Sequence, residues 1–200
     1  MRTLLFLAFF LLLPPCVMAA TPDKDVGAAQ AWLQDLKTLK ARFIQTSNDG
    51  RQLAGDFLLK RPGRMRFQYD LPVTDFIVAD GRMIYYYDGQ MKEQSNTLIS
   101  HSLADFFLRE DISFSGDLSV SGVLHDGGFL QVTLIETQEP DIGSLTLGFK
   151  EDTLQLKKWR IVDTQGAVTE VELFDVETGI SLDNDLFHYY DPEFKKQKFN

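Results

Sequence analysis

Alternation of apolar and polar residues between positions 41 and 176 is the feature of this sequence that most restricts its fold. In segment 64–69, for example, every second side chain is large and apolar, which is the period of a strand with one buried face. Turns such as Asp80-Gly81, whose two residues are expected to take positive φ, separate the segments and favour tight hairpins. The predicted strands span 41–46, 53–60, 64–69, 76–79, 83–87, 91–94, 118–124, 129–136, 144–150, 154–163, 167–176 and, at the end, 186–190.

About eleven strands in hairpin order predict a mainly β protein with some α, built on one large antiparallel sheet that must curl. Two helices are expected, over 23–39 and 102–108, because apolar residues recur there at helical spacing. We expect both helices to cover the concave side of the sheet. Periodicity does not decide whether the side chains beneath them fill a core or line a hollow.

The first residues are typical of a secretory signal peptide. A basic Arg2 precedes an apolar run, and small residues at 17–19 predict cleavage after Ala19 or Ala20. We therefore assign residues 1–19 to the signal and 20–200 to one domain, and place the mature, soluble protein in the periplasm. Prolines rather than small residues precede Cys16, so we expect no lipidation there. Because Cys16 is the only cysteine, the mature chain has no disulfide or thiol chemistry.

Charge and motifs exclude most functional classes. The formal net charge is −9, which disfavours binding to nucleic acid. His101, His125 and His188 lack metal-ligand spacing, and neither a nucleophile elbow nor a phosphate-binding loop is present. We expect no enzyme activity, no metal and no cofactor; a periplasmic hydrolase stays open as an alternative that lacks an assembled site.

Four motifs together resemble the periplasmic outer-membrane lipoprotein carriers of the LolA family. They are Gly55 to Pro62 (GDFLLKRP), Met65 to Phe67 (MRF), Ile77 to Gly81 (IVADG) and Tyr87-Asp88, and their order and spacing match over residues 24–110. The resemblance implies an unclosed half-barrel with a helical lid, whose cavity holds acyl chains. It implies acylated lipoproteins as cargo, an inner-membrane lipoprotein-releasing ABC transporter as donor, and an outer-membrane lipoprotein receptor as acceptor. We expect a monomer.

The resemblance also suggests site residues. Arg61 corresponds to the arginine that holds the lid shut through lid carbonyls, a role that suits the five donors of a guanidinium. Met65 stands where well-known members have phenylalanine. The remaining candidates are the cavity wall (Phe43, Phe57, Leu59, Met65, Phe67, Tyr69, Ile77), the lid helix (Leu103, Phe106, Phe107) and the turn (Pro62, Gly63).

The C-terminal part departs from the family pattern, because the segment after Phe187 keeps only part of its final strand and then becomes basic. Two related functions therefore stay open. One is an outer-membrane lipoprotein receptor of the same fold, which needs a lipidated N-terminus. The other is a carrier of a different amphiphile, such as a glycolipid.

Overall fold

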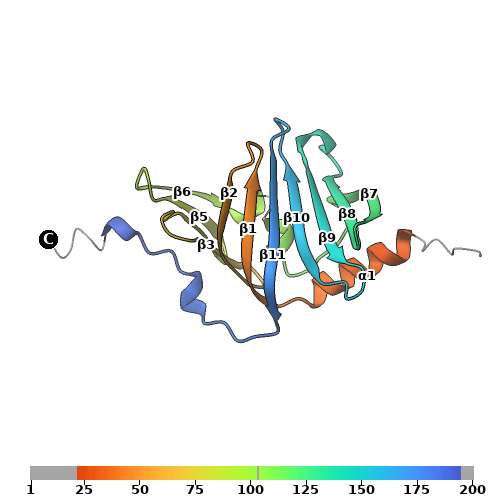
Figure 1. The fold of residues 1–200 in the computed structure, drawn as a ribbon, viewed down its shortest axis with the longest axis horizontal. Helices are drawn as coiled ribbons and strands as arrows, with labels where there is room; N and C mark the ends of the chain where they lie inside the picture. Colours follow the sequence, from red (N-terminus) through yellow and green to blue (C-terminus); the bar gives the residue numbers. More distant parts are fainter. Residues whose placement is uncertain (1–21, 103, 195–200) are drawn as a thin grey trace, which may run out of the picture.

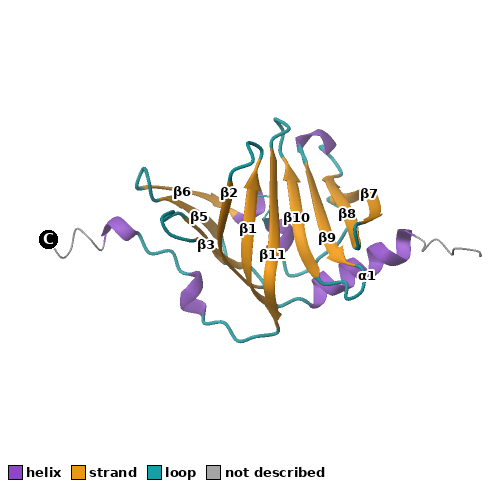
Figure 2. Cartoon of the chain, in the orientation of Figure 1, coloured by secondary structure: helices purple, strands orange, loops and turns teal. Residues whose placement is uncertain are grey.

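The computed structural model describes residues 22–102 and 104–194, and within them eleven strands form one antiparallel sheet (Figures 1 and 2). The signal peptide predicted over residues 1–19 and residues 195–200 lie outside this part of the chain. The strands are β1 (Thr38–Ser47), β2 (Gln52–Lys60), β3 (Arg64–Tyr69), β4 (Phe76–Asp80), β5 (Met83–Asp88), β6 (Glu93–Leu98), β7 (Leu118–Asp126), β8 (Phe129–Glu136), β9 (Ser144–Lys150), β10 (Leu156–Val162) and β11 (Val168–Thr178).

The sheet is strongly curled and unclosed. Its strand order is β6-β5-β4-β3-β2-β1-β11-β10-β9-β8-β7, so the first and last strands meet in the middle while β6 and β7 form separate edges. In Figure 1, β5 and β6 run almost crosswise to β1 and β11, as the twist of so wide a sheet requires. The predicted fold class is confirmed.

Helices cover the concave face between the two edges. These are the α-helices α1 (Pro22–Asp35) and α2 (Asp105–Leu108) and the 3₁₀ helix η1 (Ile99–His101). Two further 3₁₀ helices, η2 (Pro140–Ile142) in the β8–β9 connection and η3 (Asn184–Phe187) after β11, are not part of this cover. Ala29 and Leu33 of α1 are buried against the sheet, and the Trp32 ring meets Phe149 of β9 edge-on, with 6.0 Å between centroids. The helices thus share one core with the concave face. No helix in the described part of the chain is long and apolar enough to cross a membrane.

A glycine lets the core pack closely where β1, β2 and β3 meet. Phe43 of β1 lies opposite Gly55 of β2. A Cβ on Gly55 would lie 2.7 Å from the Phe43 ring and 2.1 Å from the Gln68 carbonyl oxygen. Any larger residue would therefore push β3 or the ring away. Phe43 instead packs edge-on against Phe67 and Tyr69 of β3.

The N-terminal helix is shorter than the sequence predicts. It ends at Asp35 rather than at residue 39, because Thr38 and Leu39 already belong to β1 and pair with β2. Leu39 continues the helical apolar spacing, yet it is fully buried as a strand residue opposite Leu59. Packing between two neighbouring strands thus overrides the local helical pattern.

Three further predictions need correction. The edge strand β6 covers Glu93–Leu98 instead of 91–94, because the Asp88 carboxylate accepts the N–H groups of Gln90 and Met91 and prolongs the turn. The helix expected over 102–108 is shortened to the single turn of α2, and a separate 3₁₀ helix, η1, precedes the predicted range. At Asp80-Gly81 only the glycine has a positive φ, since Asp80 ends β4 and its carboxylate caps the turn.

The predicted last strand, 186–190, is wrong. After β11 the chain leaves the sheet and runs past β3 toward the C-terminus (Figure 1). Lys60 holds this segment by donating to the carbonyl oxygen of Leu182 at 2.6 Å and to Asn184 Oδ1 at 2.8 Å. Phe187 is buried, while the Tyr189 ring packs on Phe76 of β4. The segment's aromatic residues cover the outside of the sheet instead of adding a strand.

Candidate functional site

Arg61 follows β2 directly and is the only buried polar or charged residue in the described part of the chain, at 8% exposure. All five of its N–H groups are used. Nε and Nη2 donate to the Arg109 carbonyl oxygen at 3.1 and 2.8 Å, and Nη2 also donates to Glu110 at 2.9 Å. Nη1 donates to the carbonyl oxygens of Leu33 and Leu36 at 2.5 and 3.0 Å. One guanidinium therefore joins the end of α1 to the end of α2.

These acceptors suit a cation without carrying a formal charge. Helix ends expose carbonyl groups without intrahelical partners and bear partial negative charge. No carboxylate of the described residues lies within ion-pair distance of Arg61; the nearest electrostatic influence is that of Asp111. Burial lowers the pKa of the Arg61 guanidinium, and Asp111 opposes this effect. Since the ordinary pKa is so high, Arg61 remains a buried cation held by backbone dipoles.

The turn after Arg61 takes part in the same contact. The N–H of Arg61 donates to the Lys37 carbonyl, and the N–H of Gly63 donates to the Leu108 carbonyl, both at 2.8 Å. Gly63 has a φ of 81°, a conformation that favours glycine. Pro62 is exposed. The turn thus donates a hydrogen bond to the Leu108 carbonyl, the one just before the two carbonyls of Arg109 and Glu110 that accept from the Arg61 side chain.

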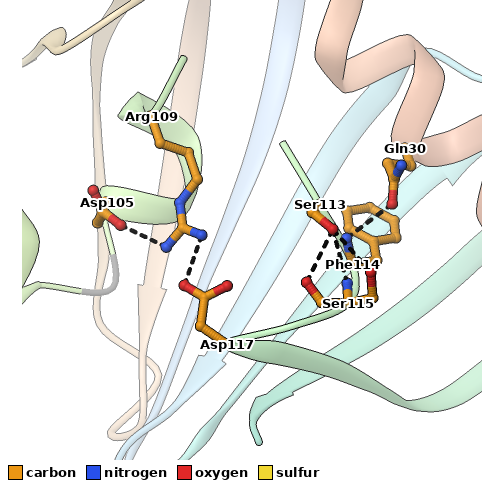
Figure 3. Close-up of polar contacts among 7 residues, drawn as sticks. All are labelled: Gln30, Asp105, Arg109, Ser113, Phe114, Ser115 and Asp117. Atoms are coloured by element: carbon orange, nitrogen blue, oxygen red, sulfur yellow. Dashed lines mark hydrogen bonds and ion pairs between the residues drawn. The ribbon is translucent and has the colours of Figure 1, made fainter. Parts of the chain in front are cut away.

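Two glutamines of α1 hold residues 109–117, the crossing segment between α2 and β7, and Figure 3 shows the contact of one of them, Gln30. Gln30 Oε1 accepts the N–H of Phe114 at 2.8 Å, and Gln34 Oε1 accepts the N–H of Ile112 at 2.6 Å. Gln30 and Gln34 are one helical turn apart, so they meet alternate residues of an extended chain. The helix and the crossing segment are therefore connected as one lid.

The Arg109 side chain fixes the residue whose carbonyl Arg61 binds. Its guanidinium forms ion pairs with Asp105 at 2.5 Å and with Asp117 at 2.8 Å (Figure 3). Asp105 begins α2 and Asp117 precedes β7, so Arg109 connects both ends of the crossing segment. The Arg109 guanidinium holds the pKa of Asp117 below its usual value.

A cavity of about 260 Å³ lies between this lid and the concave face. Its wall is mostly apolar. The lining residues are Gln45, Phe57, Met65, Phe67, Ile77, Ile84, Ser102, Ala104, Phe107, Leu145, Trp159, Ile161, Thr169 and Val171. A groove of similar size, about 270 Å³, lies on the convex face, but charged residues such as Lys158, Glu170 and Glu172 line it. Of these two spaces, the concave cavity is the one whose wall suits an apolar ligand.

The proposed wall residues divide into two groups. Phe57, Met65, Phe67 and Ile77 line the cavity. Phe43, Leu59 and Tyr69 are buried in the adjoining core and do not line it. In the lid, Phe107 lines the cavity and lies 5.2 Å from the Trp159 ring, whereas Phe106 packs on Phe114. Leu103 is outside the described residues.

A family model described as outer membrane lipoprotein carrier protein LolA matches residues 34–190. This chain belongs to the LolA family. It is 27% identical to a protein named outer-membrane lipoprotein carrier protein from Methylibium petroleiphilum, and the match covers 88% of this chain and 91% of that one. A protein of the same name from Azotobacter vinelandii is also 27% identical, over 96% of this chain and 95% of its own. An uncharacterised conserved protein from Thermus thermophilus has a similar fold, with a TM-score of 0.51, 9% identity and coverage of 86% of this chain and 96% of that one.

Sequence reasoning missed the part of the LolA-type cavity that β9, β10 and β11 contribute. Leu145, Trp159 and Val171 line it from these three strands. Alternation predicts that they face inward but not that space remains beside them. The glutamines of α1 were missed for another reason: a polar residue at every fourth position normally indicates a solvated helix face.

Among the described residues, His125 belongs to no group of three or more His, Cys, Asp or Glu side chains that could hold a metal ion. Its ring instead bridges two carboxylates, with Nδ1 2.7 Å from Glu151 and Nε2 3.2 Å from Asp25 of α1. These two contacts, the one with Glu151 first, raise the pKa of His125. The imidazole thus fastens the beginning of α1 to the turn regions of the sheet.

Proposed function

We propose that this protein carries lipoproteins through the periplasm, holding their acyl chains in the cavity beneath the lid. In this proposal the donor is an inner-membrane lipoprotein-releasing ABC transporter and the acceptor is an outer-membrane lipoprotein receptor. The signal peptide over 1–19 would bring the chain to this compartment. No step involves covalent chemistry.

The observation that carries the proposal is the position of Arg61 between the ends of α1 and α2, the helices that cover the cavity. Burying a cation that has no carboxylate partner costs free energy of folding unless hydrogen bonds compensate for the lost hydration. Arg61 meets that cost with five hydrogen bonds to backbone carbonyls on both lid helices. Water can replace these acceptors once the guanidinium leaves, so the closure is reversible. We therefore interpret Arg61 as the latch of the lid.

The size of the cavity supports a lid that opens. Ligand pockets usually measure about 300 to 1,000 Å³, and 260 Å³ lies below this range. The space between sheet and lid must therefore expand before acyl chains can enter. Phe107 is the lid residue over this space, and its contact with Trp159 would be lost on opening.

Energetics explain why a carrier needs a closed state. Each buried methylene contributes about 0.8 kcal/mol, so a chain of about sixteen carbons approaches roughly 12 kcal/mol. A protein that realised all of this energy would not release its cargo. Closing the lid after release recovers the contacts of Arg61, and this competing state lowers the apparent affinity for cargo.

Lipoprotein release from spheroplasts tests the proposal. The mature protein is incubated with spheroplasts, and co-purified material is identified by mass spectrometry; acylated lipoproteins are the expected product. Ile77→Glu places a carboxylate in the cavity wall and should release much less. Leu71→Glu makes the same change at a site with 83% exposure outside the wall and should behave like the unaltered protein.

Mass spectrometry of the same co-purified material and of the mature protein distinguishes the alternative functions. Recovery of a glycolipid without lipoprotein would show that the cargo is a glycolipid instead of a lipoprotein. An acylated Cys16 in the mature protein would favour a membrane-anchored receptor instead. Recovery of no amphiphile, or equal release by both glutamate variants, would refute the carrier role.

A further inference from the structure

One polar side chain in the apolar cavity has an amide NH₂ group without an acceptor. Gln45 of β1 lines the cavity, and its Oε1 accepts a hydrogen bond from the Tyr69 hydroxyl at 2.8 Å. Nε2 of the same amide has no hydrogen-bond acceptor among the residues that the structure describes, and it is not one of the fully buried polar atoms there, so a ligand can reach it. An apolar ligand that displaces water from this donor must replace the lost hydrogen bond.

Tyr69 fixes which end of the amide is free. Its ring is buried against Phe43, and its pKa is raised to about 12, first by burial and then by the nearby Tyr86 and Asp75. The phenol therefore keeps its proton at neutral pH and acts as a donor. With Oε1 occupied by this proton, Nε2 is the atom of Gln45 left for another partner.

Gln45 lies at the end of the cavity opposite Arg61. Arg61 donates its backbone N–H to Lys37, just before β1, whereas Gln45 stands two residues before the end of that strand. At roughly 3.3 Å per residue, the seven residues from Thr38 to Gln45 span about 23 Å. Met65, which pairs with Leu59 just before the latch, lines the cavity near Arg61, whereas Gln45 pairs with Val171 of β11 and Thr169 lies two residues from Val171 on that strand. Gln45 and Thr169 thus place polar groups at the end of the cavity far from the latch.

We propose that Gln45 Nε2 donates a hydrogen bond to a carbonyl of the linkage that joins acyl chains to their head group. The inference rests on the proposed carrier function and adds the part of the cargo that is recognised. An acylated cysteine lipid carries ester and amide carbonyls where its chains meet the glyceryl-cysteine head. With such a carbonyl at Gln45, the chains extend along the apolar wall toward Met65 and Phe107, and the peptide remains outside.

Two synthetic probes separate carbonyl recognition from apolar burial. One is a dansyl-labelled peptide whose N-terminal cysteine bears a glyceryl group with two ester-linked palmitoyl chains. The other has the same chains in ether linkage, and therefore no chain carbonyls. Because one neutral hydrogen bond is involved, we expect the unaltered protein to bind the ester probe about three- to tenfold more tightly.

Gln45→Leu keeps the approximate volume and removes the donor. We expect it to bind the ester and ether probes with equal affinity, because the preference for the ester probe is lost with the donor. Tyr69→Phe keeps the Gln45 amide but removes the hydroxyl that orients it. This variant should therefore retain part of the preference for the ester probe. Circular dichroism of both variants checks that the sheet is intact.

The outcomes discriminate between this inference and the carrier role itself. Equal binding of the two probes by the unaltered protein, or an unchanged preference in Gln45→Leu, would overturn the inference alone. An equal loss for both probes in Gln45→Leu would do the same, since it would indicate a packing effect. If the unaltered protein bound neither probe, the carrier function would fail as well.

Discussion

Replacing Arg61 by lysine keeps the charge but reduces the number of donors from five to three. In the closed protein all five donors are used, on the carbonyls of both lid helices. Lysine at this position must therefore leave at least two bonds unmade. At about 1 kcal/mol net for each bond, the closed lid loses roughly 2 kcal/mol, which is about a 30-fold shift of the equilibrium toward the open form.

Cargo affinity reports this shift if the closed lid competes with cargo. The apparent Kd is the intrinsic Kd divided by the fraction of protein that is open. We therefore expect Arg61→Lys to bind a fluorescent lipopeptide more tightly, by up to about 30-fold. Arg61→Leu should still fold, because an apolar side chain also avoids the cost of burying a charge, and should bind more tightly still. In a transfer assay to outer-membrane receptor, both variants should retain their cargo.

A matched control isolates the latch from the general effect of exchanging arginine for lysine. The side chain of Arg64, three residues later in β3, forms no hydrogen bond or ion pair with the described residues, so Arg64→Lys should leave lipopeptide affinity unchanged. Hydrogen exchange of the crossing segment gives an independent measure of lid opening. Faster exchange in Arg61→Lys without a gain in affinity would refute the competition between closure and cargo. Normal delivery by Arg61→Leu would remove Arg61 from the mechanism.

Three other contacts give further predictions. Gln34→Leu removes the acceptor of the Ile112 backbone N–H, so hydrogen exchange of this amide should accelerate by about tenfold. Gln34→Glu keeps an acceptor at this position and should therefore keep the amide protected. His125 has a raised pKa between Asp25 and Glu151, so its stabilising contribution is complete below its unfolded pKa and is lost as pH rises through the folded value. The difference in unfolding free energy between the unaltered protein and His125→Gln should therefore be larger at pH 5.5 than at pH 8.5, and below about 1 kcal/mol because the pair is exposed. The buried hydroxyl of Tyr189 has no hydrogen-bond partner among residues 22–102 and 104–194, so urea denaturation should show Tyr189→Phe to be equal or more stable by about 1 kcal/mol and Tyr189→Ala to be less stable.

The local alternation of apolar and polar residues predicts the sheet well, because within most strands it shows which face is buried. Strand β8 has the predicted bounds, and β3 follows the alternation of Met65 and Phe67 residue by residue. The failures occur where that signal is missing or misleading. β6 is exposed on both faces, so nothing in its composition fixes its ends. The terminal aromatics have strand propensity, yet η3 and Tyr189 pack on the outside of an already complete sheet.

The site is only partly visible in the sequence for a different physical reason. Family resemblance marks the position of Arg61, but its acceptors are backbone carbonyls, which every residue possesses. No residue type therefore points to Leu33, Leu36, Arg109 or Glu110 as partners. The cavity has a similar limitation. Phe43 and Phe57 share the same alternating pattern, although only Phe57 lines the space.

The choice of carbonyls over a carboxylate explains how one residue can both stabilise and release a lid. A buried arginine–carboxylate pair costs about 3 to 5 kcal/mol to break by removing a partner, since the remaining charge is stranded in an apolar site. Arg61 faces neutral acceptors at the ends of α1 and α2 instead, and opening leaves no stranded anion behind. Burial already lowers its pKa, a sign that the cation is less well solvated here than in water. Closure is therefore a small difference between desolvation and five hydrogen bonds, within the range that binding of an acyl chain can reverse.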